Sequence, residues 1–583
     1  MRTRLEAWVR AALAEKFPDL ADPSLEIIDT KSPDHGDYAC NVAMINAKKV
    51  GLAPRDFASA LIPVLLAKSE GWIKEIDVAG PGFMNFRLEP SKVGTLVGDV
   101  LDQAATFGNA SEKSGRSVNV EFVSVNPNGP ITIGSGRGAA YGDTLCRVLE
   151  ASGDTVAREY YINDGVNSEQ MRLFAESVWA LAEGRELPEN GYKGEYVSDV
   201  ADQVKAKGIP ADADTAWFQA AAQDLMIERQ KGDLALFGVE FNRWFSEQSL
   251  HDSGKVAKAL DVLKANGTAD DQPLSNEIVR EGKESKLVQK EEAPGPLWLR
   301  STQFGDDKDR VLTRSDGRPA YIAADVAYMQ DKLGDRGYDK AYLLLGPDHH
   351  GYVPRMNAVC QALGFASERF QIVIFQLVRF LKDGKPAPMR KRDGNIYELR
   401  DLIREVGETV APKESPAEQM RIGRDVGRFF YLMRSHDTSM DFDIDLATQE
   451  GDENPVFYVQ YAHARICSIV RKAEEAGFQA DAAESARLVA FEETQLIKKI
   501  IDLPYEVQRC AVDFGLHRLT TYAIELARTY HHFYGACRVI QPEQPELSRA
   551  RLALCQATAV ALRKALDLLG VSAPEVMVSL SER

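Results

Sequence analysis

The stretch from residue 117 to residue 152 constrains the fold of this chain more than any other part of the sequence. Residues 117–125 alternate and then run apolar, with Val118, Val120 and Phe122 among them, which is the pattern of a buried strand. Proline and glycine interrupt the chain at 126–130, where neither a strand nor a helix can continue. From Arg137 onward, apolar residues recur at helical spacing. The stretch therefore predicts a strand, a turn and an amphipathic helix, in that order.

The first turn of the predicted helix carries three glycines, Gly134, Gly136 and Gly138. The free N–H groups at a helix start carry partial positive charge, and glycines leave room for a ligand to approach the backbone. A phosphate group is the ligand that such a site suits best. We therefore expect a phosphate-bearing ligand at the start of this helix.

The same glycines allow a second interpretation, as a dinucleotide-binding loop. Gly134-x-Gly136-x-x-Ala139 has the spacing of that fingerprint, with Asp154 or Glu159 as the acid that binds a ribose. In the fingerprint the glycines follow the strand directly, whereas here a polar turn of nine residues, 126–134, intervenes. A nicotinamide-dependent oxidoreductase would account for this one loop and would leave the C-terminal helices unexplained.

Length and composition indicate a large protein of several domains. A chain of 583 residues corresponds to roughly three to five domains, and 44% hydrophobic with 27% charged residues is ordinary for globular proteins. No apolar run reaches the roughly 18 residues that a membrane span needs, and charged residues are mixed through residues 1–17, unlike a signal peptide. We expect a cytoplasmic protein with no membrane partner.

The cysteine pattern and the net charge limit which metal sites and nucleic-acid-binding sites this chain can have. Seven scattered cysteines form no CxxC pair and no disulfide pattern, so we expect reduced thiols, no zinc and no metal held by the protein itself. The adjacent His349 and His350 have no suitably spaced third ligand, which favours a structural or nucleotide-contact role. The formal net charge of −17 argues against a protein that coats nucleic acid, but a local basic face can still bind a nucleic acid.

The remaining pattern predicts an α/β protein with three domains. Residues 1–112 have the pattern of a small α/β module, 113–408 of a doubly wound, Rossmann-like parallel sheet, and 409–583 of an all-α domain. A hydrophilic helical insertion is expected at about 166–300. Helices are also predicted near 38–49, and a strand over 370–380. Ligands of open α/β sheets bind beyond the carboxyl ends of strands, so residues 348–351, after a predicted strand, are expected near the turn at Asn126.

Residues 121–138 resemble the signature segment of arginyl-tRNA synthetases, a family of class I aminoacyl-tRNA synthetases. The family's His-x-Gly-His signature falls on Thr132-Ile133-Gly134-Ser135, so hydroxyl residues replace both histidines. The resemblance continues along the chain at residues 36–43, 80–88, 194–196, 237–241, 249–255, 389–392, 454–465 and 569–577. It implies a class I catalytic domain between an N-terminal tRNA-binding domain and a helical anticodon-binding domain.

The resemblance also implies the reaction: arginine is activated with ATP and Mg²⁺ and transferred to the terminal ribose of tRNA(Arg). We expect a monomer. A guanidinium group needs planar carboxylate partners, so Glu121 and Asp325 are expected to recognise arginine, with Asn126 and Tyr321 holding its polar ends. Tyr321 and Asp325 lie one helical turn apart on one face. Taken alone, each acid could equally be a surface or helix-pairing carboxylate.

A basic loop is expected to close over the triphosphate of ATP. Residues 382–395 contain five cations, two prolines and two glycines, and 389–392 lie where class I synthetases carry Lys-Met-Ser-Lys-Ser. Taken alone, the loop could be an ordinary solvated one. The catalytic residues expected are Thr132, Gly134, Ser135, Arg390 and Lys391. The expected ATP contacts are Gly134, Gly136, Asp348, His350, Gly351, Met389 and Lys391.

The C-terminal helices are expected to contact tRNA. Tyr458, Tyr461 and Arg465 share one stripe of the helix predicted around 456–474, and aromatic groups beside cations suit stacking and phosphate contact with RNA. Met577 ends the segment that matches the family's last helix and tail. Generic helices also show such stripes, so it is the resemblance that assigns them to tRNA.

Two hypotheses follow from the replaced histidines. The first is an active arginine–tRNA ligase, in which Arg390, Arg392 and the helix end compensate for the missing imidazoles. The second is a catalytically silent paralogue that binds tRNA without forming an adenylate. The retained arginine contacts favour the first, because a silent paralogue would have no chemical need for them.

Overall fold

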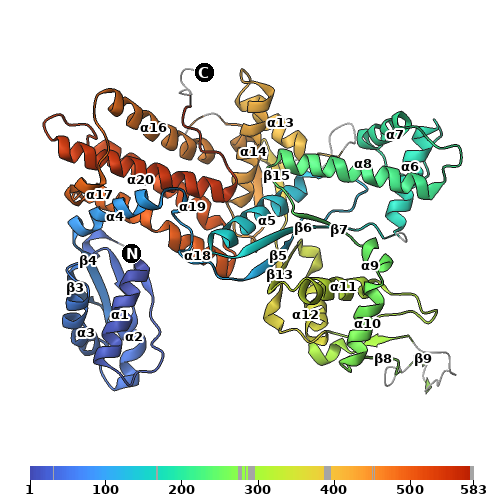
Figure 1. Ribbon diagram of the computed structural model, residues 1–583, viewed down its shortest axis with the longest axis horizontal. Helices are drawn as coiled ribbons and strands as arrows, with labels where there is room; N and C mark the ends of the chain where they lie inside the picture. The colour runs from blue at the N-terminus through green and yellow to red at the C-terminus, as the bar shows by residue number, and fades with distance from the viewer. Residues whose placement is uncertain are drawn as a thin grey trace. The chain divides into compact units, whose positions relative to one another are not determined.

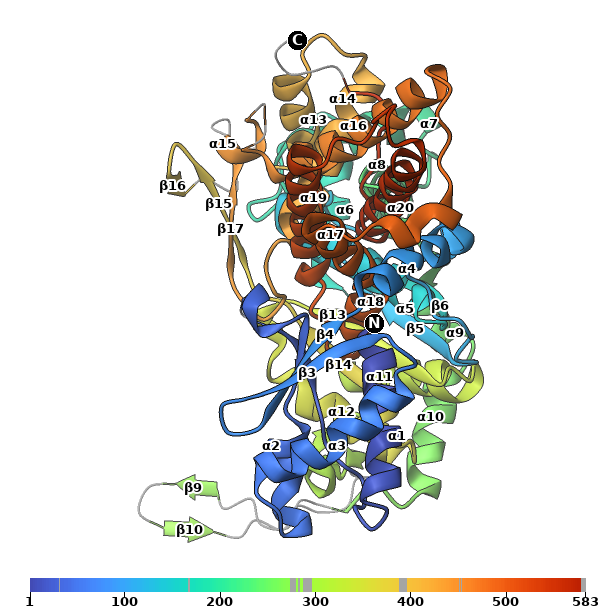
Figure 2. The same cartoon turned by 90° about the vertical axis from the view of Figure 1, so that its left-hand side faces the viewer.

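The computed structural model describes residues 1–30, 32–165, 168–272, 279–281, 284–286, 296–386, 396–449, 451 and 453–577. Two compact units make up the chain, and Figures 1 and 2 show their helices and strands. The first consists of Met1–Ala110, Glu450–Asp513 and Arg518–Arg583, and the second of Ser111–Gln449 and Phe514–His517.

The second unit is built on a five-stranded parallel sheet. Its strands lie in the order β14-β13-β5-β6-β7, and every neighbouring pair is parallel. The strands are β5 (Ser117–Glu121), β6 (Thr155–Ile162), β7 (Arg243–Ser246), β13 (Lys340–Leu345) and β14 (Phe370–Ile374). The strand order reverses between β5 and β13, which is the point where doubly wound sheets bind their ligands. The predicted Rossmann-like class is confirmed.

Helix α5 (Ile133–Ala151) follows β5 and packs closely on its neighbours. A Cβ atom added at Gly142 would lie 2.2 Å from Phe122 Cδ2, and one at Gly136 would lie 2.7 Å from the ring of Tyr431. Protein interiors have no spare room for such atoms. Gly136 and Gly142 therefore serve the packing of the helix.

An insertion of three helices lies between β6 and β7, and the helices fall where the sequence predicted them. They are α6 (Glu169–Ala182), α7 (Glu195–Lys207) and α8 (Thr215–Leu236), which share a core around Phe174, Val197 and Phe218. Strand β7 also lies within 166–300 and was not predicted. Its four residues, Arg-Trp-Phe-Ser, are too few to show a clear alternation.

Further helices and small sheets surround the parallel sheet. Helices α9 (Gln248–Asp252), α10 (Lys255–Ala265), α11 (Tyr321–Gln330) and α12 (Tyr352–Ala362) contribute to a second core, beside an antiparallel sheet of β8 (Ala269–Asp270), β11 (Trp298–Leu299) and β12 (Arg310–Val311). Two short strands, β9 (Val279–Glu281) and β10 (Glu284–Lys286), form a hairpin. Helices α13 (Leu399–Val410), α14 (Pro416–Leu432) and α15 (Ile444–Ala447) follow.

The single strand predicted over 370–380 is wrong. The chain forms β14, which ends at Ile374, and then β15 (Val378–Lys382), which belongs to a different sheet with β16 (Lys385–Pro386) and β17 (Met440–Asp443). No proline or glycine separates the two strands, so the sequence does not reveal the break between them.

The first unit contains the N-terminal α/β module. Its antiparallel sheet has the order β1-β2-β4-β3, with α1 (Arg2–Lys16), α2 (Val42–Asn46) and α3 (Pro54–Lys68) beside it. The strands are β1 (Ile27–Asp29), β2 (Tyr38–Cys40), β3 (Ile73–Ala79) and β4 (Phe83–Leu88). The helix predicted from Tyr38 is wrong at its start, because Tyr38–Cys40 pairs with β1 and β4 and the helix begins at Val42.

The C-terminal helices complete the first unit, together with α4 (Pro90–Gln103). They are α16 (Pro455–Glu475), α17 (Phe491–Ile501), α18 (Leu503–Asp513), α19 (His517–Ala536) and α20 (Pro545–Leu569). Lys498 Nζ donates a hydrogen bond of 2.8 Å to Asp37 Oδ1 and so joins these helices to the N-terminal module. The predicted α/β N-terminal and all-α C-terminal domains are confirmed, while the boundaries near residues 112 and 408 stay predictions.

Candidate active site

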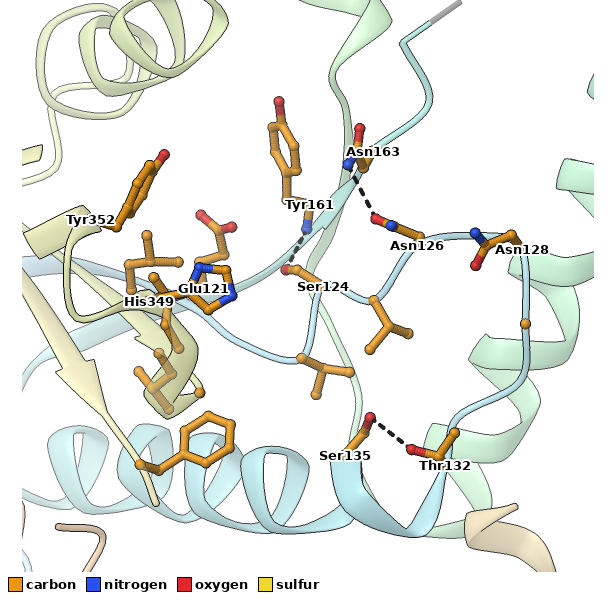
Figure 3. A pocket seen from close by; sticks show the side chains of 18 of the residues that line it. Glu121, Ser124, Asn126, Asn128, Thr132, Ser135, Tyr161, Asn163, His349 and Tyr352 are labelled. Atoms are coloured by element: carbon orange, nitrogen blue, oxygen red, sulfur yellow. Dashed lines mark hydrogen bonds between the residues drawn. The ribbon is translucent and has the colours of Figure 1, made fainter. Parts of the chain in front are cut away.

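A cavity of about 800 Å³ lies at the carboxyl ends of the central strands of the second unit. Glu121, the last residue of β5, and Tyr161, near the end of β6, line it. Thr132 and Ser135 reach it from the start of α5 (Figure 3), and Asp325 lines it from α11. The structure thus brings the predicted turn, helix start and acidic residues together at the point where the strand order reverses.

The turn after β5 has an unusual backbone. Val123 and Ser124 have φ angles of 68° and 44°, in the left-handed region that non-glycine residues rarely adopt. Each such residue costs roughly 1–3 kcal/mol, and such strain is concentrated at functional sites. The backbone N–H of Tyr161 donates to Ser124 Oγ at 3.0 Å (Figure 3), and the Tyr160 hydroxyl donates to the carbonyl of Val125 at 2.9 Å. Strand β6 therefore holds the turn in its strained form.

Two glutamines from the helical insertion fix the rest of this turn. Gln230, which is fully buried on α8, donates to the carbonyls of Asn126 and Gly129 at 3.1 and 2.7 Å. The Asn126 amide donates to Gln170 Oε1 at 2.8 Å and accepts from Asn163 at 3.1 Å (Figure 3). None of these three partners was predicted, because they lie 37 to 104 residues from Asn126 along the chain.

Thr132 and Ser135, which replace the signature histidines, face the cavity together. Thr132 directly precedes α5, and its hydroxyl oxygen lies 3.4 Å from that of Ser135 (Figure 3). The N–H of Ile133 donates to the carbonyl of Tyr397 at 3.1 Å, which anchors this helix start. The site therefore offers two hydroxyl groups and the positive end of a 19-residue helix to an anion.

The opposite wall of the cavity is acidic. Burial raises the pKa of Asp325 to about 7, the negative charges of Glu247 and Glu121 add to the rise, and a hydrogen bond from Tyr352 opposes it. Burial also raises the pKa of Tyr161 and of Tyr352 well above the ordinary value, so both hydroxyls remain donors. Figure 3 shows the Glu121 carboxylate pointing into the space between these two rings. Two carboxylates with phenol donors beside them suit a cation with several N–H groups.

Glu247 is an acid beside this cavity that was not predicted from the sequence. It follows directly after β7, hydrogen-bonds with Tyr161, and has its pKa raised, first by burial. Acids at the carboxyl ends of parallel strands are expected at the ligand site. Recognition of β7 in the sequence would therefore have pointed to Glu247.

Several predicted site residues do not line this cavity. Tyr321, the first residue of α11, is 84% exposed and is not among the lining residues. Gly136 is buried against Tyr431, and His350 is exposed, whereas His349 lines the cavity. A ligand contact by Tyr321, Gly136 or His350 stays a prediction.

A smaller cavity of about 420 Å³ lies beside His349 and Tyr352, which line both. The predicted ATP contacts Asp348 and Gly351 line this second cavity, with Lys308, Arg310 and Arg355 around it. The predicted residues Met389, Arg390 and Lys391, and Arg392 beside them, lie outside the described residues.

The predicted tRNA-binding residues lie in the first unit. Tyr458, Tyr461 and Arg465 are half-buried on one stripe of α16, as the periodicity predicted. The Arg465 guanidinium lies 4.5 Å from the ring centroid of Tyr534, and the ring of Tyr458 lies 5.3 Å from that of His531. Met577 is the last described residue of the C-terminal tail. The stripe thus presents aromatic and cationic groups side by side.

Comparison with known proteins identifies the family. The family model described as "tRNA synthetases class I (R), catalytic domain" matches residues 96–423. The model described as "Arginyl tRNA synthetase N terminal domain" matches residues 3–88, and the one described as "DALR anticodon binding domain" matches residues 459–577. The chain belongs to the arginyl-tRNA synthetase family. This membership excludes the dinucleotide interpretation of the glycines, and Glu159, one of its candidate ribose acids, is buried against Arg336.

Relatives of this synthetase cover almost its whole length. A protein of Halalkalibacterium halodurans named arginine–tRNA ligase 1 is 40% identical over 98% of both chains. The structure of Thermus thermophilus arginyl-tRNA synthetase matches with a TM-score of 0.75 at 23% identity, covering 99% of this chain and 100% of that one. The Plasmodium falciparum arginyl-tRNA synthetase matches with a TM-score of 0.75 at 17% identity and covers 99% of both chains. These two structures support the fold.

Helices and groups of ligating residues in this synthetase bear on membrane and metal binding. Within the described ranges, no single helix has the length and apolar character to cross a membrane, although the bent pair 42–50 and 54–68 together passes that test of length and composition. In the same part of the chain, no three His, Cys, Asp or Glu residues are grouped to hold a metal ion. All seven cysteines are free thiols.

Proposed function

We propose that this chain is an arginine–tRNA ligase that activates arginine with ATP and transfers it to the terminal ribose of tRNA(Arg). The observation that carries the proposal is one cavity with an acidic wall, Glu121 and Asp325, opposite an anion-binding helix start at Thr132. The positive guanidinium group of arginine suits the acidic wall, and the negative phosphates of ATP suit the helix start. The family of the chain and the name of its 40%-identical relative agree with this reaction.

In this proposal, arginine enters with its guanidinium towards Glu121 and Asp325. A guanidinium group donates in a plane, so two carboxylates can bind it with charge-assisted hydrogen bonds. Asn126 binds the polar end of arginine, and Tyr321 closes over the substrate from the start of α11. Glu247, beside Tyr161, accepts from the α-ammonium group. The distance between the acidic wall and the helix start then sets the length of amino acid that reaches the phosphate.

ATP binds as its magnesium complex at the start of α5, where Thr132, Gly134 and Ser135 meet its phosphates. A magnesium ion would be held largely by the substrate phosphates and would neutralise part of their charge. Asp348, Gly351 and the loop with Met389, Arg390 and Lys391 complete the ATP site. Gly136 and His350 are further contacts in this proposal.

The reaction has two transfers. An oxygen of the arginine carboxylate attacks the α-phosphorus of ATP, the bond to the β-phosphate oxygen breaks, and pyrophosphate leaves. A hydroxyl of the terminal ribose then attacks the carbonyl carbon of the adenylate, and AMP leaves. Charge builds on the phosphate oxygens in the first step, so placement and cationic groups supply most of the catalysis.

The remaining parts of the chain bind the tRNA. We propose that residues 1–112 contact tRNA outside its acceptor end and that 409–583 bind the anticodon through Tyr458, Tyr461, Arg465 and Met577. Aromatic rings that stack on bases, with cations at phosphates, are the means by which proteins bind single-stranded RNA loops. The enzyme is proposed to be a cytoplasmic monomer.

Charging of total tRNA with radiolabelled arginine tests the proposal, for the wild type and for Asp325→Ala. Charging that requires ATP and is lost in Asp325→Ala supports the ligase and the arginine site. If tRNA binds without any charging by the wild type, the chain is a silent tRNA-binding paralogue and the proposal fails.

A second experiment tests the replaced histidines. A hydroxyl lacks the charge of an imidazolium, and the loss of one charge-assisted hydrogen bond costs roughly 1.5–3 kcal/mol, or about one to two orders of magnitude in rate. Arg390 and Arg392 of the basic loop, together with the positive end of α5, are proposed to compensate for the missing imidazoles. The double variant Thr132→His/Ser135→His is therefore expected to form adenylate at the wild-type rate, and a rate at least tenfold higher would show that the native site is impaired.

A further inference from the structure

A buried lysine, Lys332, lies at the acidic wall of the cavity, and the proposed reaction assigns it no role. It belongs to a π-helical turn, Asp331–Asp335, that continues α11 beyond Asp325. Its ammonium group donates a hydrogen bond to Glu121 Oε2, and the two side chains are only 3% and 8% exposed. Lys332 lines the cavity. A charge buried this deeply persists only when it is paired, and π-helical turns occur often at functional sites.

Glu159 is the other acid near Lys332, but it is satisfied by different groups. Strands β5 and β6 pair in parallel, with Glu121 opposite Glu159. Glu159 binds the Arg336 guanidinium, with one contact of 2.9 Å, and accepts from the Tyr328 hydroxyl. Lys332 Nζ stays 3.8 Å from Glu159 Oε1. The lysine therefore acts mainly on Glu121.

The other charged side chains around Lys332 form ion pairs with one another. Arg336 Nε lies 2.6 Å from Asp331 Oδ2, and Lys255 bridges Asp331 and Asp335 with a contact of 3.0 Å to the latter. Within the described part of the chain, the hydrogen bond from Lys332 is the one that reaches the Glu121 carboxylate. Its second oxygen, Oε1, remains for a group inside the cavity.

We propose that Lys332 is a positioning residue for arginine: it holds one oxygen of Glu121 and so presents the other oxygen to the guanidinium group of the substrate. This inference rests on the proposed assignment of Glu121 and Asp325 to arginine. The ammonium also compensates one of the two carboxylates, so the acidic wall keeps about one net negative charge for one guanidinium. Without Lys332, the Glu121 carboxylate loses the hydrogen bond that fixes its orientation, whereas Glu159 keeps its pair with Arg336.

Steady-state charging of tRNA(Arg) measures this role. Lys332→Met is expected to raise the KM for arginine about tenfold or more, with kcat within about threefold of the wild type, because ground-state and transition-state binding of the guanidinium weaken alike. Lys332→Arg, which retains the charge, is expected to recover most of the loss. Lys255→Met is the matched control: it removes a cation of the same network that is 32% exposed and pairs with Asp331 and Asp335, and it should leave the KM unchanged.

A double-mutant cycle distinguishes positioning from a general structural role. Glu121→Gln alone is expected to raise the KM for arginine, and adding Lys332→Met to it should change the KM by less than about twofold, because the lysine acts through Glu121. Multiplying effects in the double variant, or an unchanged KM in Lys332→Met, would overturn the inference. If Glu121→Gln itself leaves the KM unchanged, the proposed arginine site fails instead. Should Lys332→Met not fold, Lys332→Gln, which keeps a donor without the charge, takes its place in the same cycle.

Discussion

Replacement of Asp325 by asparagine should stabilise the second unit at high pH while it weakens arginine binding. Asparagine keeps the size of the side chain and an oxygen that accepts from Tyr352, and it lacks the charge. Burial raises the pKa of Asp325 from 3.8 to about 7, so the fold favours the protonated carboxyl group. The stability contributed by this protonated group is complete below the unfolded pKa and is lost as the pH rises through the folded pKa.

The magnitude follows from the pKa shift. A rise of Asp325 from 3.8 to about 7, at about 1.4 kcal/mol per unit, gives an upper limit of about 4 kcal/mol for the cost of ionisation at pH 8. At pH 5 the same linkage leaves about 1.5 kcal/mol, because only the unfolded chain is ionised there. With an unfolding entropy of about 2.1 cal/mol/K per residue, a unit of this size gains about 1.5 °C in Tm per kcal/mol.

Scanning calorimetry of the wild type and Asp325→Asn at pH 5 and pH 8 checks the reasoning. We expect Asp325→Asn to raise the Tm of one transition by up to about 6 °C at pH 8 and by about 2 °C at pH 5. Asp261→Asn, at a surface position that is 75% exposed, is the control and should show neither change. A Tm gain that is equal at the two pH values, or a loss at pH 8, would refute the account of Asp325.

The same variant links the pKa to arginine binding. In the wild type, the KM for arginine should fall between pH 6 and pH 8, because the ionised carboxylate binds the guanidinium and Asp325 ionises with a pKa of about 7. Asp325→Asn should raise the KM about tenfold or more at pH 8 and should lose most of this pH dependence. A wild-type KM that rises with pH over this range would contradict the assignment.

Two further substitutions test what holds the site in place. Gln230→Met, which leaves the carbonyls of Asn126 and Gly129 without their buried donor, should lower kcat/KM for arginine about tenfold or more, whereas Gln170→Met, at an exposed residue, should have a smaller effect in the same assay. Arg428→Met breaks the buried pair between α14 and Asp143 of α5, in which the side chains are 0% and 3% exposed, and should destabilise the second unit by about 3–5 kcal/mol in denaturant unfolding. Arg147→Met, whose side chain is 31% exposed beside the same carboxylate, should cost about 1 kcal/mol or less, and an equal loss in both variants would contradict the role of burial.

Local pattern was sufficient for much of the fold. Strand β5, the turn and α5 were predicted because their apolar residues repeat with the periods of a strand and a helix over 5 and 19 residues. The rule that ligands lie beyond the carboxyl ends of strands also placed residues near 348 beside the turn at Asn126, and His349 and Asn126 line the same cavity. The same method failed for β7 and for Tyr38–Cys40, because strands of three or four residues contain too few alternations.

Apart from short strands such as β7, the succession of strands and helices could be predicted from the sequence, as could the family and the cavity side chains Glu121, Thr132, Ser135 and Asp325. The tertiary structure alone decided which groups act on them. Gln230 is 104 residues from Asn126, and Lys332 is 211 residues from Glu121, and neither separation leaves any periodic signal in the sequence. Periodicity records only which face of an element is buried, whereas a buried hydrogen bond or ion pair is selected by the close packing of elements that meet once the chain has folded.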